Sequence, residues 1–379
     1  MKKKAMFLVG QNQYGVISEM VRRIADHLEQ EGYEIGRYEF EDLVRYKAEK
    51  EQDWEFIFSA LGVEFNLFSG ADGKRHVAWL VDHPIYHLSR FENYPDKDQV
   101  YIGCVDRSHV PYLKERCGFK NSFFLPHIGW ECEKQIPYAE RSIDVFFPAS
   151  YSSVQKLIEE NAGWMEGAVK IIVERVISYM QEQDTVTMEQ AIEDVLRRLG
   201  EPEAAAIAAE LESKVGWYID AYLRGLTREG IVRGLLQRGI KLTVCGRNWE
   251  EYKKSLPVEM AANLIILSEN MPYLEIVEKM ADSKMVLNVL PAFKDGSHER
   301  VVMATMNGAI SVTDESKFLT EVYQDGKEIV FYDRKDMDGL ADKIRWILSH
   351  EDEATAIAEA GKSVAANNFT VENIRKWIG

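Results

Sequence analysis

Apolar residues along this chain gather in short runs, and the stretches between the runs often carry apolar residues at helical spacing. Runs that are apolar at nearly every position are typical of strands covered on both faces of a parallel sheet. They predict strands at 5–9, 33–38, 56–59, 76–81, 100–105 and 122–125, and then at 143–147, 240–245, 264–267, 285–290, 309–313 and 328–332. Strands that alternate with helices form βαβ units, so the pattern predicts an α/β protein.

The two series of strands indicate two domains. The chain has 379 residues, which is long for a single domain and comfortable for two. We expect an α/β fold of two doubly wound, Rossmann-like parallel-sheet domains that face a cleft. The predicted domains are 1–140 and 141–365, followed by a C-terminal helix over 366–379 that returns to the first domain.

The second domain is predicted to carry a helical insertion over 153–225, which a Rossmann-like sheet does not need. Thr187 and Gln190 match a capping box at the start of one of its helices. Pro202 suits the first turn of a further helix that ends near Arg224. The sequence leaves open whether the insertion is a structural lid, a surface for homo-oligomer formation or a docking site for an acceptor.

Composition and charge exclude several classes of partner. The net charge of −16 argues against nucleic acid and against an anionic membrane surface. The four cysteines form no CxxC pair, so we expect reduced thiols and no metal bound to them. The first apolar run is too short for a signal peptide or a membrane span. We therefore expect a cytoplasmic protein without a transmembrane segment.

The segment 283–314 is the most informative part of the chain. It reads as a strand, a loop, a helix from about His298 to Asn307 and a second strand. The first strand is apolar except for Asn288, and the turn at 295–297 offers N-cap chemistry.

Arg300 is the unusual residue of this segment. A cation in the first turn of a helix opposes the helix macrodipole, so an Arg and a His at this position favour a bound phosphate. The alternative is that Arg300 is a solvated residue at the edge of a loop. Open α/β sheets bind ligands in loops at the carboxyl ends of strands, where this loop lies. The candidate residues of the loop are Asp295, Gly296, Ser297, His298, Glu299 and Arg300.

Two other loops of the second domain are candidates for the same phosphate group. Ser150 and Tyr151 follow its first strand, and Gly246, Asn248 and Trp249 follow its second strand. A glycine after a strand lets the backbone approach a ligand closely, although glycines are common at such positions for structural reasons.

The first domain offers candidate general bases. Asp82 and His83 directly follow an apolar strand, and His127 ends another. Histidine accepts protons near neutral pH, and a carboxylate can take the same role. The alternative for each histidine is a structural residue with satisfied hydrogen bonds.

Several other kinds of site are not supported. No GxGxxG motif follows the first strand, and no GxxxxGK[ST], GxSxG or HExxH motif occurs in the chain. This argues against a dehydrogenase and a P-loop hydrolase. Asp96-Lys97-Asp98 follows a turn rather than an apolar strand, so we interpret it as a solvated turn and predict no metal site.

These motifs resemble the donor-binding half of bacterial group 1 glycosyltransferases of the two-domain GT-B fold. The resemblance is carried by VLNVLP, DGSHERVVMATMNGAISVTD and FLTEVYQDGKEIVFY, with LVDHP, LPHIG and RSIDVFFPASY as supporting pieces. Within the family, the chain is most similar to the branch related to the spore-maturation glycosyltransferases. The resemblance covers 218–378 well and 1–151 loosely, and it does not explain the helices between 154 and 215.

The resemblance implies that the second domain binds a nucleotide-diphosphate sugar of the UDP type as substrate, without a cofactor, and that the first domain binds the acceptor. The residues implied to hold the diphosphate are Gly296, Ser297, His298 and Arg300. Many retaining members of the family have glutamates where this chain has Asp295 and Met303. Since Met303 cannot bind the donor ribose as the second glutamate does, the choice between retention and inversion stays open.

From these observations we expect a metal-independent glycosyltransferase of the hexosyltransferase type. It would move a sugar to a hydroxyl of a carbohydrate, lipid or protein acceptor. Two alternatives remain from the sequence: a non-catalytic module that binds nucleotide sugars, which the methionine at 303 favours, and a nucleotide-sugar epimerase.

Overall fold

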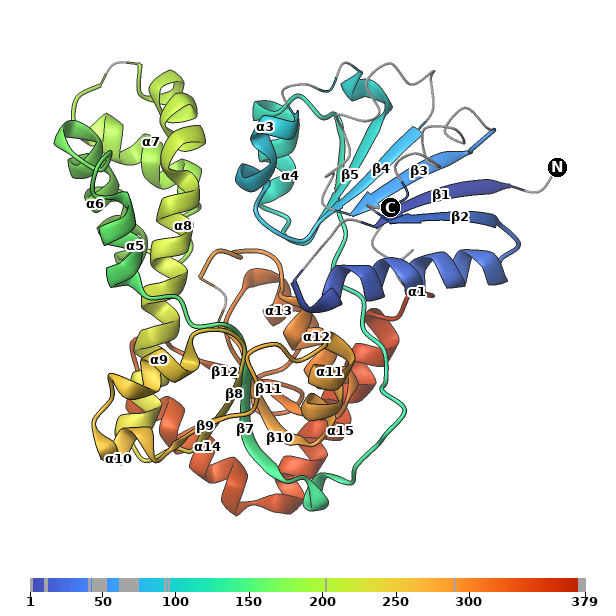
Figure 1. Ribbon diagram of the computed structural model, residues 1–379, viewed down its shortest axis with the longest axis vertical. Coiled ribbons are helices and arrows are strands. Elements are labelled where there is room, and N and C mark those ends of the chain that lie inside the picture. Colours follow the sequence, from blue (N-terminus) through green and yellow to red (C-terminus); the bar gives the residue numbers. More distant parts are fainter. Residues whose placement is uncertain are drawn as a thin grey trace. The chain divides into compact units, whose positions relative to one another are not determined.

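The computed structural model describes residues 3–9, 13–39, 42, 53–60, 75–91, 94, 96–201, 203–289 and 291–373. The chain divides into two compact units, residues 1–129 with 367–379 (unit 1) and residues 130–366 (unit 2). The sequence places these boundaries at 140 and 365. Each unit contains one parallel sheet with flanking helices, which confirms the predicted fold class (Figure 1).

Unit 1 is built around a six-stranded parallel sheet in the described residues, with the order β2-β1-β3-β4-β5-β6. Its strands are β1 Lys4–Val9, β2 Glu34–Glu39, β3 Phe56–Ala60, β4 Arg75–Leu80, β5 Val100–Cys104 and β6 Asn121–Phe124. Its helices are α1 Val16–Gln30, α3 Leu88–Phe91 and α4 His109–Pro111, with short turns η1 Gln13–Gly15, η4 Pro84–His87, η5 Lys97–Gln99 and η6 Tyr112–Arg116. All described strands overlap the predicted ranges, the central ones because they are apolar enough to be covered on both faces, whereas the edge strand β2 alternates between exposed and buried residues.

Unit 2 contains the second six-stranded parallel sheet, with the order β12-β11-β10-β7-β8-β9. Its strands are β7 Ile143–Pro148, β8 Leu242–Cys245, β9 Leu264–Ile266, β10 Ser283–Leu287, β11 Ile310–Asp314 and β12 Val330–Tyr332. The elements between and beside them are η7 Tyr138–Glu140, α5 Val154–Asn161, α6 Gly167–Glu182, α7 Met188–Arg198, α8 Ala204–Gln237, α9 Trp249–Lys254, α10 Val258–Ala261, α11 Tyr273–Ala281, α12 Glu299–Met306, α13 Lys317–Val322, α14 Met337–Ser349 and α15 Glu351–Asn368.

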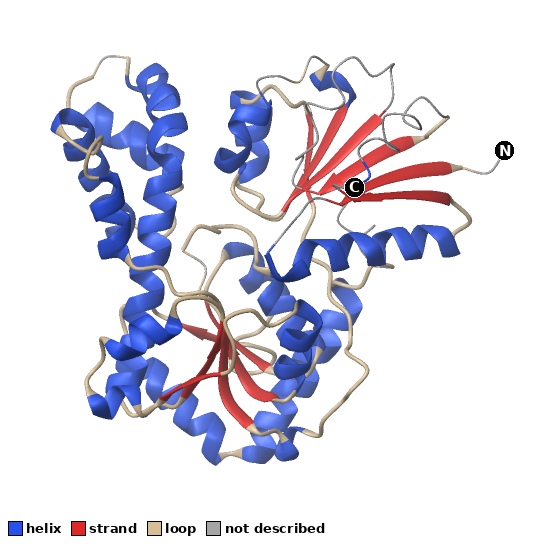
Figure 2. Cartoon of the chain, viewed as in Figure 1, coloured by secondary structure: helices blue, strands red, loops and turns tan. Residues whose placement is uncertain are grey.

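Side chains along the strands of unit 2 point alternately to the two faces of the sheet, and a different set of helices covers each face. Val145 and Phe147 of β7 belong to a core cluster with Leu235 and Leu236 of α8 and Leu340 of α14. Successive strand residues point to opposite faces, so the residues between them point to the other side, where α11 and α12 contact β10. Helices therefore lie against both faces of the sheet (Figure 2).

The helical insertion comprises α5, α6, α7 and the first part of α8, which pack on one another and stand apart from the sheet of unit 2 (Figure 1). The Thr187–Gln190 capping box at the start of α7 is present. The predicted end of the last insertion helix near Arg224 is wrong, because α8 continues to Gln237. Its second half is buried in the core of unit 2, so the packing carries the helix past Gly225.

The predicted C-terminal helix is also wrong over part of its length. α15 already begins at Glu351 and ends at Asn368, and residues 369–373 form turns. The rest of the predicted helix, 374–379, lies outside the described residues.

Candidate functional site

The strand order of unit 2 reverses between β7 and β10. From β7 the chain proceeds outward to β8 and β9, and it then returns to β10 on the other side of β7 and continues to β11 and β12. β7 and β10 are therefore neighbours whose following loops diverge. Open α/β sheets bind ligands at the carboxyl ends of the strands at such a switch point.

Arg300 lies at this switch point. It is only 4% exposed, so the alternative of a solvated residue is wrong. Its Nε donates to the carbonyl oxygen of Pro148 at 3.1 Å, and its Nη1 donates to Oδ1 of Asn288 at 2.8 Å. In the described part of the chain, Nη2 makes no hydrogen bond and the guanidinium forms no ion pair. The side chain is thus fixed in place with hydrogen-bonding capacity left over.

Asn288 is the residue that orients this guanidinium. It is completely buried directly after β10, and its Nδ2 donates to Oγ1 of Thr313 at 3.0 Å. The hydroxyl of Tyr332 donates to its carbonyl oxygen at 2.8 Å. The amide therefore points its oxygen toward Arg300 because its other groups are already bonded to β11 and β12. The single polar residue in an apolar run was the signal for this role in the sequence.

The start of α12 differs from its prediction in one respect. The N-cap is His298 rather than Ser297, because Nδ1 of His298 accepts the backbone N–H of Arg300 at 3.3 Å. A nitrogen that accepts the Arg300 N–H carries no proton, whereas the contact of the same Nδ1 with the Glu299 carboxylate requires one. Burial lowers the pKa of His298, which favours the neutral form, and the Glu299 carboxylate beside the ring opposes the shift.

Ser297 is almost completely buried between Gly296 and the N-cap. Its hydroxyl has no hydrogen-bond partner among the residues that the structure describes. The carbonyl of Gly296 is held by the hydroxyl of Ser316 at 2.6 Å. The loop before α12 is thus anchored through its backbone and leaves one buried hydroxyl unsatisfied, which is uncommon in folded proteins.

Arg228 of α8 belongs to the same charged group, and sequence reasoning missed it. Burial, and then the charge of Arg300, lower the pKa of Arg228, and Arg228 in turn lowers the pKa of His298. Its Nε is buried without a hydrogen-bond partner, and within the described ranges its guanidinium forms no ion pair. Asp220 and then Glu299 raise the pKa of Arg228, and Glu299 also raises that of Arg300, so the two arginines share a region with nearby carboxylates.

The two other candidate loops are joined to each other. Oγ of Ser150 accepts the N–H of Arg247 at 3.2 Å, Nδ2 of Asn248 donates to the carbonyl of Tyr151 at 3.1 Å, and Nε1 of Trp249 donates to that of Ala149 at 2.6 Å. Trp249 is 1% exposed, so its visible role is to hold the turn after β7. Direct contact of Ser150, Tyr151, Asn248 or Trp249 with a ligand stays a prediction.

The conformation at position 246 requires glycine because two loops of the chain approach each other there, which the sequence could not show. Its φ is +130°, and a Cβ atom there would lie 2.8 Å from the backbone nitrogen of Ser150. Only glycine permits this approach of the two loops. The close approach is therefore to another part of the chain, and an approach to a ligand stays a prediction.

Asp295 and Met303 lie in very different environments. Met303 is completely buried in α12, which leaves it in the core. Oδ2 of Asp295 lies 3.7 Å from Nζ of Lys317 at the start of α13. Met303 thus offers no carboxylate at its position, and Asp295 faces the start of α13.

The candidate bases belong to unit 1. Asp82 is exposed directly after β4. His83 is buried and caps the turn η4, because its Nδ1 accepts the N–H of Ile85 at 3.2 Å. His127 is buried after β6, with its ring 5.8 Å from that of Trp79. Asp82 is thus the member of the three that faces solvent.

The described residues contain neither a cluster of metal ligands nor a membrane-spanning helix. No group of three His, Cys, Asp or Glu side chains in these residues is arranged to hold a metal ion. None of the described helices combines the length and the apolar character needed to cross a bilayer.

Comparison with known proteins gives one family and a set of similar folds. Residues 228–377 match a family described as glycosyl transferase-like. No curated protein matches the chain. The structure of Anabaena HepE in complex with UDP and glucose has a TM-score of 0.57 and 11% identity, and the match covers 99% of this chain and 98% of HepE.

Two further structures are similar over nearly their whole length. Sucrose-phosphate synthase from Thermosynechococcus elongatus has a TM-score of 0.58 and 10% identity, over 98% of this chain and 96% of the synthase. An alpha-glucosyltransferase in complex with UDP-glucose and DNA containing an abasic site has a TM-score of 0.59 and 10% identity, over 98% of this chain and 97% of that enzyme. The narrower resemblance to the spore-maturation branch stays a prediction. Residues 228–377 therefore match the glycosyl transferase-like family, and the chain as a whole shares the two-sheet fold of these solved structures.

Proposed function

We propose that this protein transfers a sugar from a nucleotide-diphosphate donor of the UDP type to a hydroxyl of its acceptor. The glycosyltransferase family match supports the reaction class. Structures of the same fold that hold UDP or UDP-glucose support the donor class. The acceptor is a carbohydrate, a lipid or a protein, and the charge of the chain argues against nucleic acid.

The observation that carries the proposal is the pair of arginines at the switch point of unit 2. Negative charge develops on the leaving diphosphate in the transition state, and preorganised cations stabilise it most where water is excluded. Arg300 is held by two internal acceptors but keeps Nη2, and Nε of Arg228 has no partner in the described residues. A diphosphate would satisfy both guanidinium groups, with the positive end of α12 beside it.

We further propose that transfer needs no metal ion. The two guanidinium groups would supply the positive charge that a bound cation supplies in other sites. His298 and Ser297 would contribute neutral donors, the imidazole through Nε2–H and the serine through its buried hydroxyl. The proton of the acceptor hydroxyl would be taken by Asp82 of unit 1, the solvent-facing carboxylate of the predicted bases.

A panel of nucleotide sugars tests the reaction class. The protein is incubated with each donor and a mixture of acceptors, with and without a chelator, and released nucleoside diphosphate and sugar-bearing product are measured together. We expect one donor to give both products in equal amounts, and the chelator to leave the rate unchanged. An epimerised donor without released diphosphate would contradict transfer.

Met303 favours a second candidate, a binding module that holds nucleotide sugars without turnover. A methionine leaves α12 without a carboxylate at the position where, by the resemblance, retaining enzymes carry one, and its side chain is completely buried. The same panel separates the two functions, because a binding module would raise the melting temperature with one donor and release no product.

A further inference from the structure

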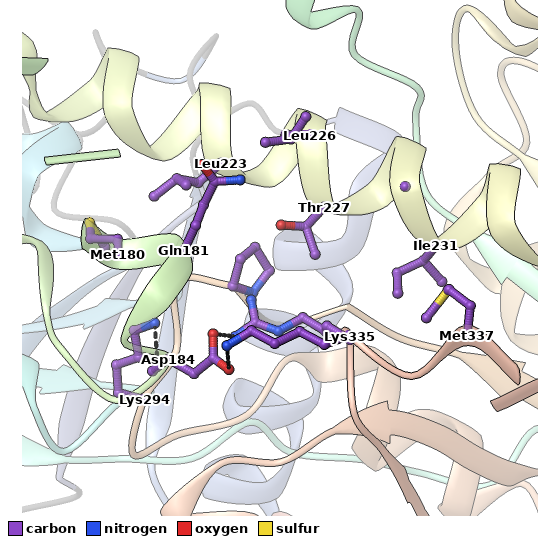
Figure 3. A pocket seen from close by; sticks show the side chains of 13 residues that line it. Met180, Gln181, Asp184, Leu223, Leu226, Thr227, Ile231, Lys294, Lys335 and Met337 are labelled. Carbon is purple, nitrogen blue, oxygen red and sulfur yellow. Dashed lines mark hydrogen bonds and ion pairs between the residues drawn. The ribbon is translucent and has the colours of Figure 1, made fainter. Parts of the chain in front are cut away.

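Unit 2 contains a pocket that none of the candidate residues lines. It encloses about 300 Å³ where the insertion meets the loops after β10 and β12 (Figure 3). One wall is apolar and includes Met180 of α6, Leu223, Leu226 and Ile231 of α8, and Met337 of α14. A volume of this size holds a small molecule, and apolar walls with a few polar groups are typical of ligand sites.

The opposite wall carries three cations. Lys294 comes from the loop after β10, and Arg334 and Lys335 follow β12 (Figure 3 labels the lysines). All three meet one aspartate of the turn between α6 and α7. Nη2 of Arg334 lies 3.0 Å from Oδ1 of Asp184, and Nζ of Lys335 lies 3.4 Å from its Oδ2. Nζ of Lys294 donates to the carbonyl oxygen of Asp184 at 2.7 Å.

The ion pairs on this wall are partly exposed. Arg334 lies 3.5 Å from a second carboxylate, that of Asp314, in addition to Asp184. The Asp184 and Lys335 side chains are 43% and 58% exposed, and ion pairs with such exposure contribute little to stability. A phosphate ester carries nearly two negative charges near neutral pH and offers three acceptor oxygens. Such a group offers the three cations of the wall more charge and more acceptor oxygens than the Asp184 carboxylate does.

We propose that this pocket is a second ligand site, which binds a small phosphate ester with an apolar body. Its phosphate takes the place of the Asp184 carboxylate at Arg334 and Lys335, and its apolar body lies against Leu223, Leu226 and Met337. The site is distinct from the diphosphate site, because neither Arg228 nor Arg300 lines it. Lys294, which lines the pocket, also belongs to the loop that leads into α12.

Calorimetry on the full chain tests this site with phenyl phosphate as the probe. Inorganic phosphate lacks the apolar body, so its weaker binding would measure the contribution of the apolar wall. Phenol lacks the phosphate, so its weaker binding would measure the contribution of the cations. We expect phenyl phosphate to bind at least about tenfold more tightly than either one, because it uses both walls. Saturating UDP should change this affinity by less than about twofold, since independent sites do not couple.

Three variants locate the probe in the pocket. Asp184→Asn removes the competing charge with little change of shape, and should tighten phenyl phosphate binding by about tenfold. Lys335→Gln should weaken it by a similar factor of about ten. Lys241→Gln is the matched control, an exposed lysine elsewhere in unit 2, and should have no effect.

Several results would overturn the proposal. If neither the wild-type chain nor Asp184→Asn binds phenyl phosphate, the wall is only a set of structural ion pairs. If Lys335→Gln and Lys241→Gln behave alike, the probe binds elsewhere. If UDP displaces the probe, the pocket is part of the donor site. That last result leaves the proposed transfer reaction intact, because UDP binding is measured separately.

Discussion

A covered guanidinium without an ion pair is costly for a protein, and the described residues place two such arginines near each other: Arg300 is buried, and Arg228 is partly buried with its Nε covered. Arg300 is fixed by Pro148 and Asn288, and Arg228 approaches from α8 without an ion pair in the described residues. Folding alone gives no reason to keep both charges in one low-dielectric region, since such groups are normally paired. A dianionic ligand would remove the cost, which is why we propose that the site binds a diphosphate.

Arg228→Met tests this reasoning at one residue. We expect kcat/KM for the donor to fall by about tenfold or more, because a cation is lost that stabilises the leaving group. The melting temperature should stay equal or rise, since an unpaired buried charge is removed. Arg197→Met, on the exposed surface of α7, is the matched control and should change neither quantity. A loss of stability with unchanged turnover would make Arg228 a structural residue.

Substitution of Arg300 would not separate an effect on turnover from an effect on stability. Its removal leaves the Asn288 amide oxygen and the Pro148 carbonyl unsatisfied in the core, so turnover and stability would fall together. The sequence predicted this arginine because it stands in the first turn of a helix. The sequence could not predict that Arg228 lies near Arg300, because this proximity depends on where α8 crosses the sheet.

Elements rather than single residues set the shape of the site. α12 begins at the switch point because His298 caps it and an apolar run then buries every residue from Arg300 to Met306. The turn after β7 is held against the loop after β8 by Gly246, Asn248 and Trp249. Both arrangements place loop backbone at the carboxyl ends of β7 and β10.

The cap of α12 should make stability depend on pH. Burial places the pKa of His298 below its ordinary value, so the unfolded state binds more protons than the folded state as pH falls through about 6.5. Stability linked to this residue is therefore present above about pH 6.5 and is lost below it. His298→Asn keeps a capping acceptor without a titrating group.

Urea denaturation of both proteins above and below this pH measures the effect. The wild-type free energy of unfolding should fall relative to that of His298→Asn on acidification. Parallel profiles for the two proteins would mean that the imidazole does not titrate between the folded and unfolded states.

Gly246→Ala tests the junction of the two loops. The new Cβ would meet the backbone of Ser150 at 2.8 Å at a φ of +130°, so we expect unfolding to become easier by more than about 2 kcal/mol. Gly230→Ala in α8 is the matched control, because no atom lies within 4 Å of its added Cβ. That change should stabilise the chain by up to about 1 kcal/mol. Equal effects would show that the loop junction is not strained.

The sequence located elements better than it located their ends. Strands of a parallel sheet are apolar runs, so every described strand was found, whereas β10 begins two residues before its predicted start, at Ser283 rather than at 285. The end of α8 was missed because Gly225 suggested a stop, whereas packing against the core of unit 2 carries the helix on to Gln237. Ser297 was preferred over His298 as a cap on residue type alone.

At the scale of the whole molecule, each unit carries one part of the proposed chemistry. Unit 2 holds the arginine pair and the family match, and unit 1 holds the exposed carboxylate of Asp82. Sequence alone predicted both sheets, because two series of apolar runs need two sheets. It did not predict that the insertion would share its last helix with the core of unit 2.

Asp82→Asn tests the proposed proton transfer in unit 1 separately from donor binding in unit 2. We expect transfer to be abolished, because the amide cannot take the proton of the acceptor hydroxyl. UDP affinity by calorimetry should be unchanged, since the diphosphate is assigned to unit 2. Asp42→Asn, at another described carboxylate of unit 1, is the control. Unchanged transfer would remove Asp82 from the mechanism, and a lost UDP affinity would place the donor differently.

The most direct test of the central claim is a crystal structure of the protein with UDP. We predict the two phosphate groups at the carboxyl ends of β7 and β10, with oxygens within hydrogen-bonding distance of the guanidinium groups of Arg228 and Arg300. Density for the diphosphate away from these arginines, with Arg228 still unpaired, would contradict it.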